Sequence, residues 1–290
     1  MRARNAGSRD IVINHLSDKS TSIRRSKKIF STQANDCVVA VARGYRWLSW
    51  FVYVHLCALV VGYWWGCGGG CAIVVGCHIM FIVQIFLPRS RFYAPVVDRL
   101  PGRFPWVWLT IDDGPSEDTL ALLDLLDRYQ ARATFFLIAS QALERPDVVR
   151  AIVARGHTIG NHTYSHPRAW FWTLGPRKMA RQIGDAQEVL SQLTGTAPRW
   201  FRSVAGMTNP CVARSLQQHQ LTRVAWSVRG FDGVRCDPER AIARLKANIT
   251  PSAIILVHEG GVAGQSMRVI EGVLKHLKCL DYATIIPKSL

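Results

Sequence analysis

Two uncharged apolar stretches lie close together in the first third of the chain. One runs for 19 residues from Trp47 to Trp65, the other for 16 residues from Ala72 to Leu87, with "CGGGC" between them. A helix that crosses a bilayer core needs about 20 apolar residues, and Trp and Tyr favour its two interfaces. The pattern predicts an integral membrane protein with a transmembrane hairpin at 44–88; a pair of buried helices in a soluble fold is the alternative.

Basic residues flank this hairpin on both sides. A basic polar tail, 1–43, precedes it, and a basic linker, 89–104, follows it. Arg43 and Arg46 stand before the hairpin, whereas the intervening loop carries no charge. Because positive charge favours the cytoplasmic side, the pattern predicts that both ends, and hence residues 105–290, lie in the cytoplasm. The alternative is that only the first stretch spans the membrane, which would place residues 105–290 on the other side.

The net charge of +16 is compatible with nucleic acid, anionic lipid or an anionic substrate. The sequence has no zinc-finger spacing, RNP-like aromatic motif or Gly-rich phosphate loop, so we expect no nucleic-acid partner. Eight cysteines are scattered or lie in apolar stretches, which predicts free thiols and favours a reducing compartment. They are Cys37, Cys57, Cys67, Cys71, Cys77, Cys211, Cys236 and Cys279.

From residue 104 onward, β-rich runs alternate with helical patterns. The clearest helix is expected at 177–194, where apolar residues recur at helical spacing. This alternation predicts an α/β fold with a parallel sheet, open or closed as a barrel, whose chemistry collects at the carboxyl ends of the strands. We expect strands at 106–111, 132–138, 157–160, 199–203, 222–228, 253–258 and 282–286.

Two adjacent acids, Asp112 and Asp113, follow the first of these strands. By themselves they could cap a helix and form a turn. His162 and His166, however, stand four apart in "GNHTYSH", and on a helical turn both imidazoles would face the same ion. Two histidines and one carboxylate form a recurring metal site, and the second acid could then remove a proton from water.

Two further residues stand at strand ends. His258 closes "AIILVH" and could act as a general acid, although a histidine there is more often a core residue. Arg202 in "RWFRSVAG" could orient a carboxylate through two hydrogen bonds, or simply be solvated.

Residues 105 to 287 resemble the polysaccharide deacetylase (NodB-homology) family. The resemblance rests on the order T-I-D-D-G-P, N-H-T-x-S-H, R-x-x-x-G, W-S-x-x-x-x-D and L-V-H, together with "ARATFF". It implies a distorted (β/α)7-type barrel, preceded here by the two transmembrane helices. It also implies metal-dependent hydrolysis of an N-acyl group, acetyl or formyl, on an amino sugar of a glycan or lipid-linked saccharide.

The resemblance also implies roles for single residues. The metal ligands would be Asp113, His162 and His166, and the cofactor one divalent metal, by default zinc, with cobalt, nickel or iron as alternatives. The residues implied to be catalytic are the base Asp112, the acid His258, Arg202, which holds Asp112, and Asp232, which orients His258. Leu256 would line the pocket for the acyl methyl group.

Three positions depart from the family pattern. Val204 replaces a proline, Arg229 an acid and Gly233 a tryptophan; Trp170 or Trp172 could fill the aromatic position and bind substrate. Two alternatives therefore stay open: an O-acetyl esterase on the same scaffold, and a catalytically silent, membrane-bound glycan-binding module. A cytoplasmic domain would act on a lipid-linked sugar or a soluble precursor rather than on a polymer outside the membrane.

Overall fold

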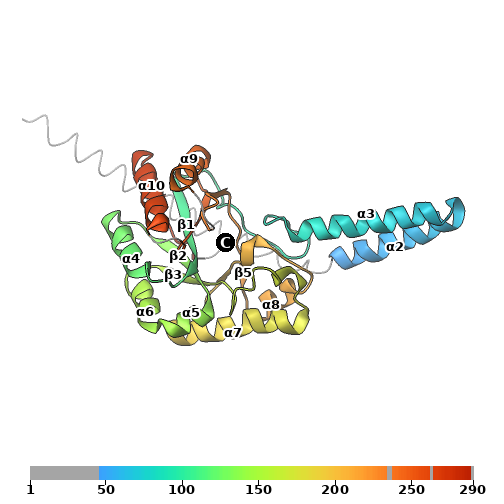
Figure 1. Ribbon diagram of the computed structural model, residues 1–290, viewed down its shortest axis with the longest axis horizontal. Helices are drawn as coiled ribbons and strands as arrows, with labels where there is room; N and C mark the ends of the chain where they lie inside the picture. The colour runs from blue at the N-terminus through green and yellow to red at the C-terminus, as the bar shows by residue number, and fades with distance from the viewer. Residues whose placement is uncertain (1–45, 234–236, 262–263, 289–290) are drawn as a thin grey trace, which may run out of the picture. The chain divides into compact units, whose positions relative to one another are not determined.

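The computed structural model describes residues 46–233, 237–261 and 264–288 (Figure 1). The described residues from Arg46 to Pro287 belong to one compact unit. The expected basic tail, Arg43, Cys37 and Cys236 lie outside the described residues. The six described cysteines are free thiols, as predicted.

Eight strands form one curled sheet in which all the strand pairs are parallel. Along the sheet the order is β5-β4-β3-β2-β1-β7-β6, and β8 pairs with the start of β1. Parallel pairing places all carboxyl ends at one edge, where β1, β3 and β7 carry the acids and histidines. The strands are β1 (Trp106–Gly114), β2 (Ala133–Leu137), β3 (Thr158–Asn161), β4 (Trp200–Phe201), β5 (Thr222–Arg223), β6 (Val228–Arg229), β7 (Ile254–His258) and β8 (Ala283–Thr284).

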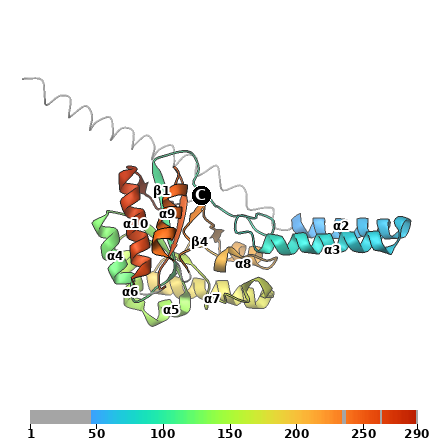
Figure 2. The ribbon, with the colours of Figure 1, turned by 45° about the horizontal axis from the view of Figure 1, so that its top comes forward.

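Helices cover one face of the sheet, so that it forms a half-barrel (Figures 1 and 2). Along β1, Val107, Leu109 and Ile111 point into this helix-covered core, as do Ile255 and Val257 of β7. Such alternation, with period two, is what a strand with one apolar face requires. The helices are α4 (Thr119–Arg128), α5 (Ala139–Glu144), α6 (Pro146–Ala154), α7 (Pro176–Thr194), α8 (Val212–Gln218), α9 (Pro238–Asn248) and α10 (Gln265–Cys279), with 3₁₀ turns η2 (Phe171–Thr173) and η3 (Val204–Gly206). The expected α/β architecture is confirmed, and the curled sheet is consistent with a distorted (β/α)7 barrel.

The other face of β1 is polar and equally buried. Trp108 Nε1 donates to Thr134 Oγ1 at 2.8 Å, and Thr110 Oγ1 donates to the Ile255 carbonyl at 2.6 Å. Buried polar groups need such partners, because an unpaired one costs about 1–3 kcal/mol. The interior of the half-barrel therefore has a polar lining below the carboxyl ends of the strands, where the acids and histidines lie.

The prediction of one strand at 222–228 is wrong, because the chain forms two short strands there, β5 and β6. β5 and β6 stand at opposite ends of the strand order. Between them the carbonyls of Val224 and Ala225 accept hydrogen bonds from the Arg202 guanidinium at 3.3 and 3.0 Å. The Arg202 side chain thus binds carbonyls that a neighbouring strand would otherwise use, and the β-ladder is interrupted at Val224 and Ala225.

An antiparallel pair of helices precedes the barrel: α2 (Arg46–Trp65) and α3 (Cys67–Ile85). Both are long and apolar enough to cross a membrane by length and composition. They approach closely at Gly70, where an added Cβ would lie 2.7 Å from the Ala58 carbonyl and 3.2 Å from Gly62 Cα. Small residues are typical of helix pairs packed in this way.

The base of this helix pair packs against the barrel. Tyr93 OH donates to the Phe81 carbonyl at 2.9 Å, and Thr208 N to the Ile85 carbonyl at 2.9 Å. Buried Arg223 donates to the carbonyls of Pro88 and Ser90. The segment expected as a linker is thus packed on the sheet, with Tyr93, Ala94, Val96 and Leu100 buried.

Candidate active site

The two adjacent acids at the end of β1 reach the same side of the sheet. In a regular strand, Asp112 and Asp113 would point to opposite faces. Asp113 instead has φ 72°, and the register with β2 shifts between Asp112 and Gly114. Aspartate tolerates this left-handed conformation better than most residues, and a bulge re-aims its side chain. Both carboxylates consequently approach one imidazole: Asp112 Oδ2 lies 3.8 Å and Asp113 Oδ1 3.3 Å from His162 Nε2.

His162 and His166 lie in a tight turn after β3, not on the helical turn expected from their spacing. Thr163 and His166 have φ of 72° and 50°, which a right-handed α-helix does not allow. The turn is held by Asn161, whose Oδ1 accepts from Thr163 N at 2.9 Å, while its Nδ2 donates to the Ile183 carbonyl of α7. The convergence of the two histidines was expected, but local side-chain bonding rather than helical periodicity produces it.

Three potential ligand atoms meet at this point. Those of Asp113, His162 and His166 all lie within 4.8 Å of one another. His162 Nδ1 is 2.8 Å from the Arg202 carbonyl oxygen, which accepts a hydrogen bond from the protonated Nδ1. The other ring nitrogen, Nε2, then faces Asp113. Two imidazole nitrogens and one carboxylate oxygen form a donor set that suits a divalent transition metal.

The charges of this cluster are coupled. Although burial raises the pKa of Asp113, its hydrogen bond to His162 and the nearby histidines hold it well below the usual range. Burial lowers the pKa of His166 to about 3, so its ring is neutral at physiological pH and can act as a ligand. Burial also disfavours charge on His162, but Asp112 and Asp113 raise its pKa overall.

Asp112 is buried, and its counter-charge is buried with it. Arg202 Nη1 donates to Asp112 Oδ1 at 2.7 Å and to Thr110 Oγ1 at 2.7 Å. The guanidinium also lies 4.2 Å from the centre of the Phe136 ring. Burial lowers the pKa of Arg202 although Asp112 opposes this. Arg202 and Asp112, which the resemblance paired, are therefore in direct contact.

His258 stands across the site at the end of β7. Its backbone N–H donates to Asp232 Oδ2 at 2.8 Å, and its Nδ1 lies 3.2 Å from Asp232 Oδ1. Burial lowers the pKa of His258, but the hydrogen bond and charge of Asp232 outweigh this and raise it above the usual value. Asp232 thus fixes the ring and favours its protonated form.

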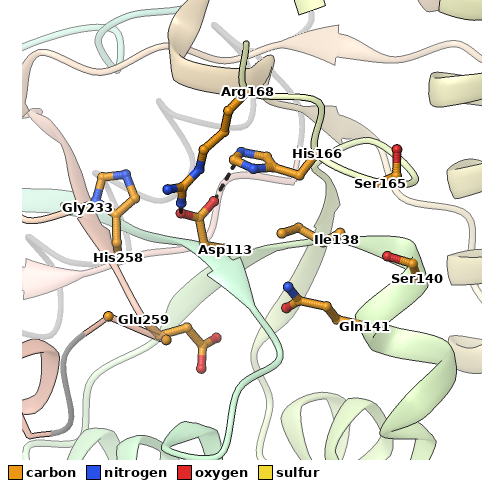
Figure 3. A pocket seen from close by; sticks show the side chains of 12 residues that line it. Asp113, Ile138, Ser140, Gln141, Ser165, His166, Arg168, Gly233, His258 and Glu259 are labelled. Atoms are coloured by element: carbon orange, nitrogen blue, oxygen red, sulfur yellow. Dashed lines mark hydrogen bonds and ion pairs between the residues drawn. The ribbon is translucent and has the colours of Figure 1, made fainter. Parts of the chain in front are cut away.

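Asp113, His166 and His258 line a cavity of about 380 Å³ that opens at this end of the sheet (Figure 3). Leu256 is buried two residues before His258 on the same strand, below the described lining. Trp170 and Trp172 do not line the cavity. Trp170 is 67% exposed, and the Trp172 ring lies 5.6 Å from that of Phe86, which makes it part of the packing near α3.

The three departures from the family pattern have structural explanations. Val204 is buried in an apolar cluster beside α7 and α8. Arg229 stacks on Phe231, with its guanidinium 4.0 Å from the ring centre. A Cβ on Gly233 would lie 2.9 Å from the His258 ring, so His258 itself occupies the space, and no tryptophan is needed to fill it.

Two charged residues of the cavity lining, Glu259 and Arg168, were not anticipated from the sequence. Glu259 is buried directly after His258, and Ser116 Oγ donates to its Oε2 at 2.9 Å. Arg168 donates to Asp113 Oδ2 at 2.9 Å. The available signals were an acid in "VHEG" and a base in "SHPR", and neither pattern by itself distinguishes a buried role from an exposed one.

The region of the chain that holds this site is similar to known proteins. A polysaccharide deacetylase family profile matches residues 101–224. The chain is 34% identical over 170 residues to a chitooligosaccharide deacetylase of Sinorhizobium fredii, spanning 58% of this chain and 78% of that protein. It is 33% identical over 175 residues to a peptidoglycan-N-acetylglucosamine deacetylase of Bacillus cereus, spanning 59% of this chain and 63% of that one.

Solved structures are similar over the same region. A peptidoglycan N-acetylglucosamine deacetylase is 29% identical with a TM-score of 0.61, over 66% of this chain and 89% of that one. A family 4 carbohydrate esterase pseudoenzyme from Bacillus anthracis is 25% identical with a TM-score of 0.59, over 65% of this chain and 66% of that one. A mutant of that pseudoenzyme has restored enzymatic activity.

The chain belongs to the polysaccharide deacetylase family. The deacetylases named above are hydrolases that act on carbon–nitrogen bonds, and the family is in general metal-dependent. The expected family is thereby confirmed, and the deacetylases among its members support the expected enzyme class.

Proposed function

We propose that this protein hydrolyses the N-acyl group, acetyl or formyl, of an amino sugar. The observation that carries the proposal is the meeting of Asp113, His162 and His166, all within 4.8 Å, with Asp112 beside them and His258 across one cavity. The relatives named above, a chitooligosaccharide deacetylase and a peptidoglycan-N-acetylglucosamine deacetylase, support an amino-sugar substrate.

Asp113, His162 and His166 would hold one divalent metal ion. Their donor set fits zinc, and cobalt, nickel or iron by the same geometry. Bound there, such an ion supplies Lewis-acid polarisation of the acyl carbonyl. The neutral ring of His166 and the fixed tautomer of His162 suit both histidines to this role.

Asp112 is assigned the role of general base. Arg202 places a positive charge against Asp112 in a buried site, and the carboxylate would accept a proton from the attacking water. The same contact orients it. Arg202 therefore acts on the reaction through Asp112, by fixing its position and its charge.

His258 is assigned the role of general acid, which delivers a proton to the departing amine. Asp232 favours the protonated ring and holds Nδ1, so that Nε2 is the nitrogen left to face the cavity. Leu256, below His258, would contribute to the apolar surface that receives the acyl methyl group. Trp170 and Trp172 lose support as substrate-binding residues, because neither lines the described cavity.

The α2–α3 pair would anchor the protein as a membrane hairpin, and residues 105–290 would be its catalytic domain. Large apolar side chains are exposed along both helices, which supports contact with lipid. The flanking arginines favour a cytoplasmic active site, on a lipid-linked or soluble saccharide. Reporters active on only one side of the membrane, fused at the C-terminus, test the orientation; an extracytoplasmic result would redirect the proposal to cell-wall polymers.

The proposed reaction is tested with the full chain in detergent. The metal would be removed with a chelator and restored as Zn²⁺ or Co²⁺, and the release of acetate or formate followed with N-acyl amino-sugar oligomers. Metal-dependent release is expected. Release from O-acetyl but not from N-acetyl analogues would favour the esterase, which uses the same residues.

A silent binding module is the second candidate, since a pseudoenzyme shares the fold. Against it, the five groups that carry the proposed chemistry are all present: Asp112, Asp113, His162, His166 and His258. No release from any substrate by a chain that binds no metal, but does bind glycan, would support the silent module.

A further inference from the structure

Arg168 lies at the mouth of the cavity, two residues after His166. Its Nη2 donates to Asp113 Oδ2 at 2.9 Å, although its side chain is 61% exposed (Figure 3). The residue thus combines an accessible guanidinium with a position directly beside the proposed reaction centre.

The rest of the cavity offers no comparable group. Among the described residues that line it, Arg168 is the one lysine or arginine. The neutral polar side chains of the lining are those of Ser140, Gln141 and Ser165. His258 is also cationic when protonated, but its side chain is 15% exposed and is held by Asp232, so Arg168 is the more exposed cation of this mouth and the better placed to bind an anionic group.

The charges of the neighbouring groups indicate which sign of ligand fits. Asp112 is already balanced by Arg202 through a contact of 2.7 Å. Asp113 is the partner of Arg168, yet Asp113 also belongs to the three residues that would hold a divalent cation. With that cation in place the mouth has an excess of positive charge, and Arg168, being exposed, is free to turn toward an anion from solution.

We propose that Arg168 is a specificity-determining residue that binds an anionic group, phosphate or carboxylate, carried by the amino-sugar substrate next to its acyl amide. The planar guanidinium can donate two parallel hydrogen bonds to either group, which a lysine cannot. The proposal rests on the proposed function and names the substrate class of that same cavity.

The test compares three N-acetyl amino sugars with the metal-loaded full chain at constant ionic strength. They are N-acetylglucosamine 1-phosphate, N-acetylmuramic acid with its carboxylate, and the neutral methyl glycoside of N-acetylglucosamine. The wild-type chain is expected to show a KM about tenfold lower for one of the anionic sugars than for the neutral one. Which of the two is preferred distinguishes a phosphate from a carboxylate substrate.

Arg168→Gln is expected to abolish this preference by raising KM for the anionic sugar, and Arg168→Lys to retain part of it. Arg150→Gln is the matched control, because Arg150 is 59% exposed, pairs with Asp147 and does not line the cavity. An equal preference in Arg168→Gln and in the control would overturn the proposal, as would a wild-type chain that prefers the neutral sugar.

A binding measurement separates this proposal from the proposed function. Calorimetry in an Asp112→Asn background, with the same sugars and without turnover, should show weaker binding of the anionic sugar when Arg168→Gln is added. If the wild-type chain releases no acyl group but this difference is present, the hydrolase fails and the anion site stands. If neither anionic sugar binds better than the neutral one, the anion site is wrong.

Discussion

Two carboxyl groups are buried to the same depth at the ends of neighbouring strands, yet their surroundings differ. Asp112 on β1 is 3% exposed and Glu259, just after β7, is 2% exposed. Asp112 faces the guanidinium of Arg202 at 2.7 Å. Glu259 is held by the hydroxyls of Ser116 and Thr119, and its Oε1 has no hydrogen-bond partner among the described residues.

The absence of a cationic side chain beside Glu259, in the part of the chain that the structure describes, affects its protonation. Burial raises the pKa of Glu259 to about 7, although its two hydroxyl partners oppose this. Among the described residues, Glu259 has no guanidinium beside it of the kind that Arg202 gives Asp112. The two sites are also joined, because Glu259 N donates to the Asp112 carbonyl at 3.0 Å. Partners rather than depth thus distinguish Asp112, to which we assign proton transfer, from Glu259, which ties the β1–α4 turn to β7.

The largest expected effect on stability comes from removing the Arg202 guanidinium, which lies beside Asp112 and has no counterpart beside Glu259 among the described residues. Arg202→Gln leaves Asp112 buried without a counter-charge, which should destabilise the protein by about 3–5 kcal/mol. Thermal unfolding of the full chain in detergent measures this, with Arg150→Gln as the control for a surface ion pair, which should cost about 0–1 kcal/mol. Equal effects of the two substitutions would contradict the comparison.

A second prediction uses the pH dependence of Glu259. Because its folded pKa is raised above the unfolded value of about 4.5, the neutral acid stabilises the fold fully below that pH, and the stabilisation is lost as pH rises to about 7. Relative to Glu259→Gln, the wild type should lose about 3 kcal/mol of stability between pH 5 and pH 8. A stability difference that does not vary with pH would show that Glu259 titrates normally.

Gly114 offers a smaller and more local test. An added Cβ there would lie 1.9 Å from Glu259 Oε1. Gly114→Ala should therefore cost about 2 kcal/mol through overpacking, and less in a Glu259→Ala background where the space is free. Additive effects of the two substitutions in unfolding measurements would argue against this contact.

Much of the sheet could be predicted from the sequence, because runs such as "AIILVH" and "RATFFLI" are strongly apolar and bounded by turns. Asp112, Asp113 and His258 could be placed at one edge, since parallel strands share their carboxyl ends. Arg202 was a candidate from its place after a strand, and the resemblance then supplied its partner Asp112 and the pairing of Asp232 with His258; these contacts span 90 and 26 residues.

Other features depended on contacts that local patterns do not contain. His162 and His166 converge through Asn161 and strained backbone rather than through helical spacing. The 222–228 stretch breaks because Arg202 uses its carbonyls. Glu259 and Arg168 acquire their roles from partners more than 50 residues away, and a single sequence does not show such pairings.

The central claim is that Asp113, His162 and His166 hold a metal while Asp112 serves as the base. It is tested most directly by measuring bound metal and acyl release in the same samples of wild type, Asp112→Asn and His162→Ala. Asp112→Asn is expected to keep the metal and lose about 10²–10⁴-fold in turnover, whereas His162→Ala should lose both. Full turnover by Asp112→Asn, or wild-type metal content in His162→Ala, would contradict the account.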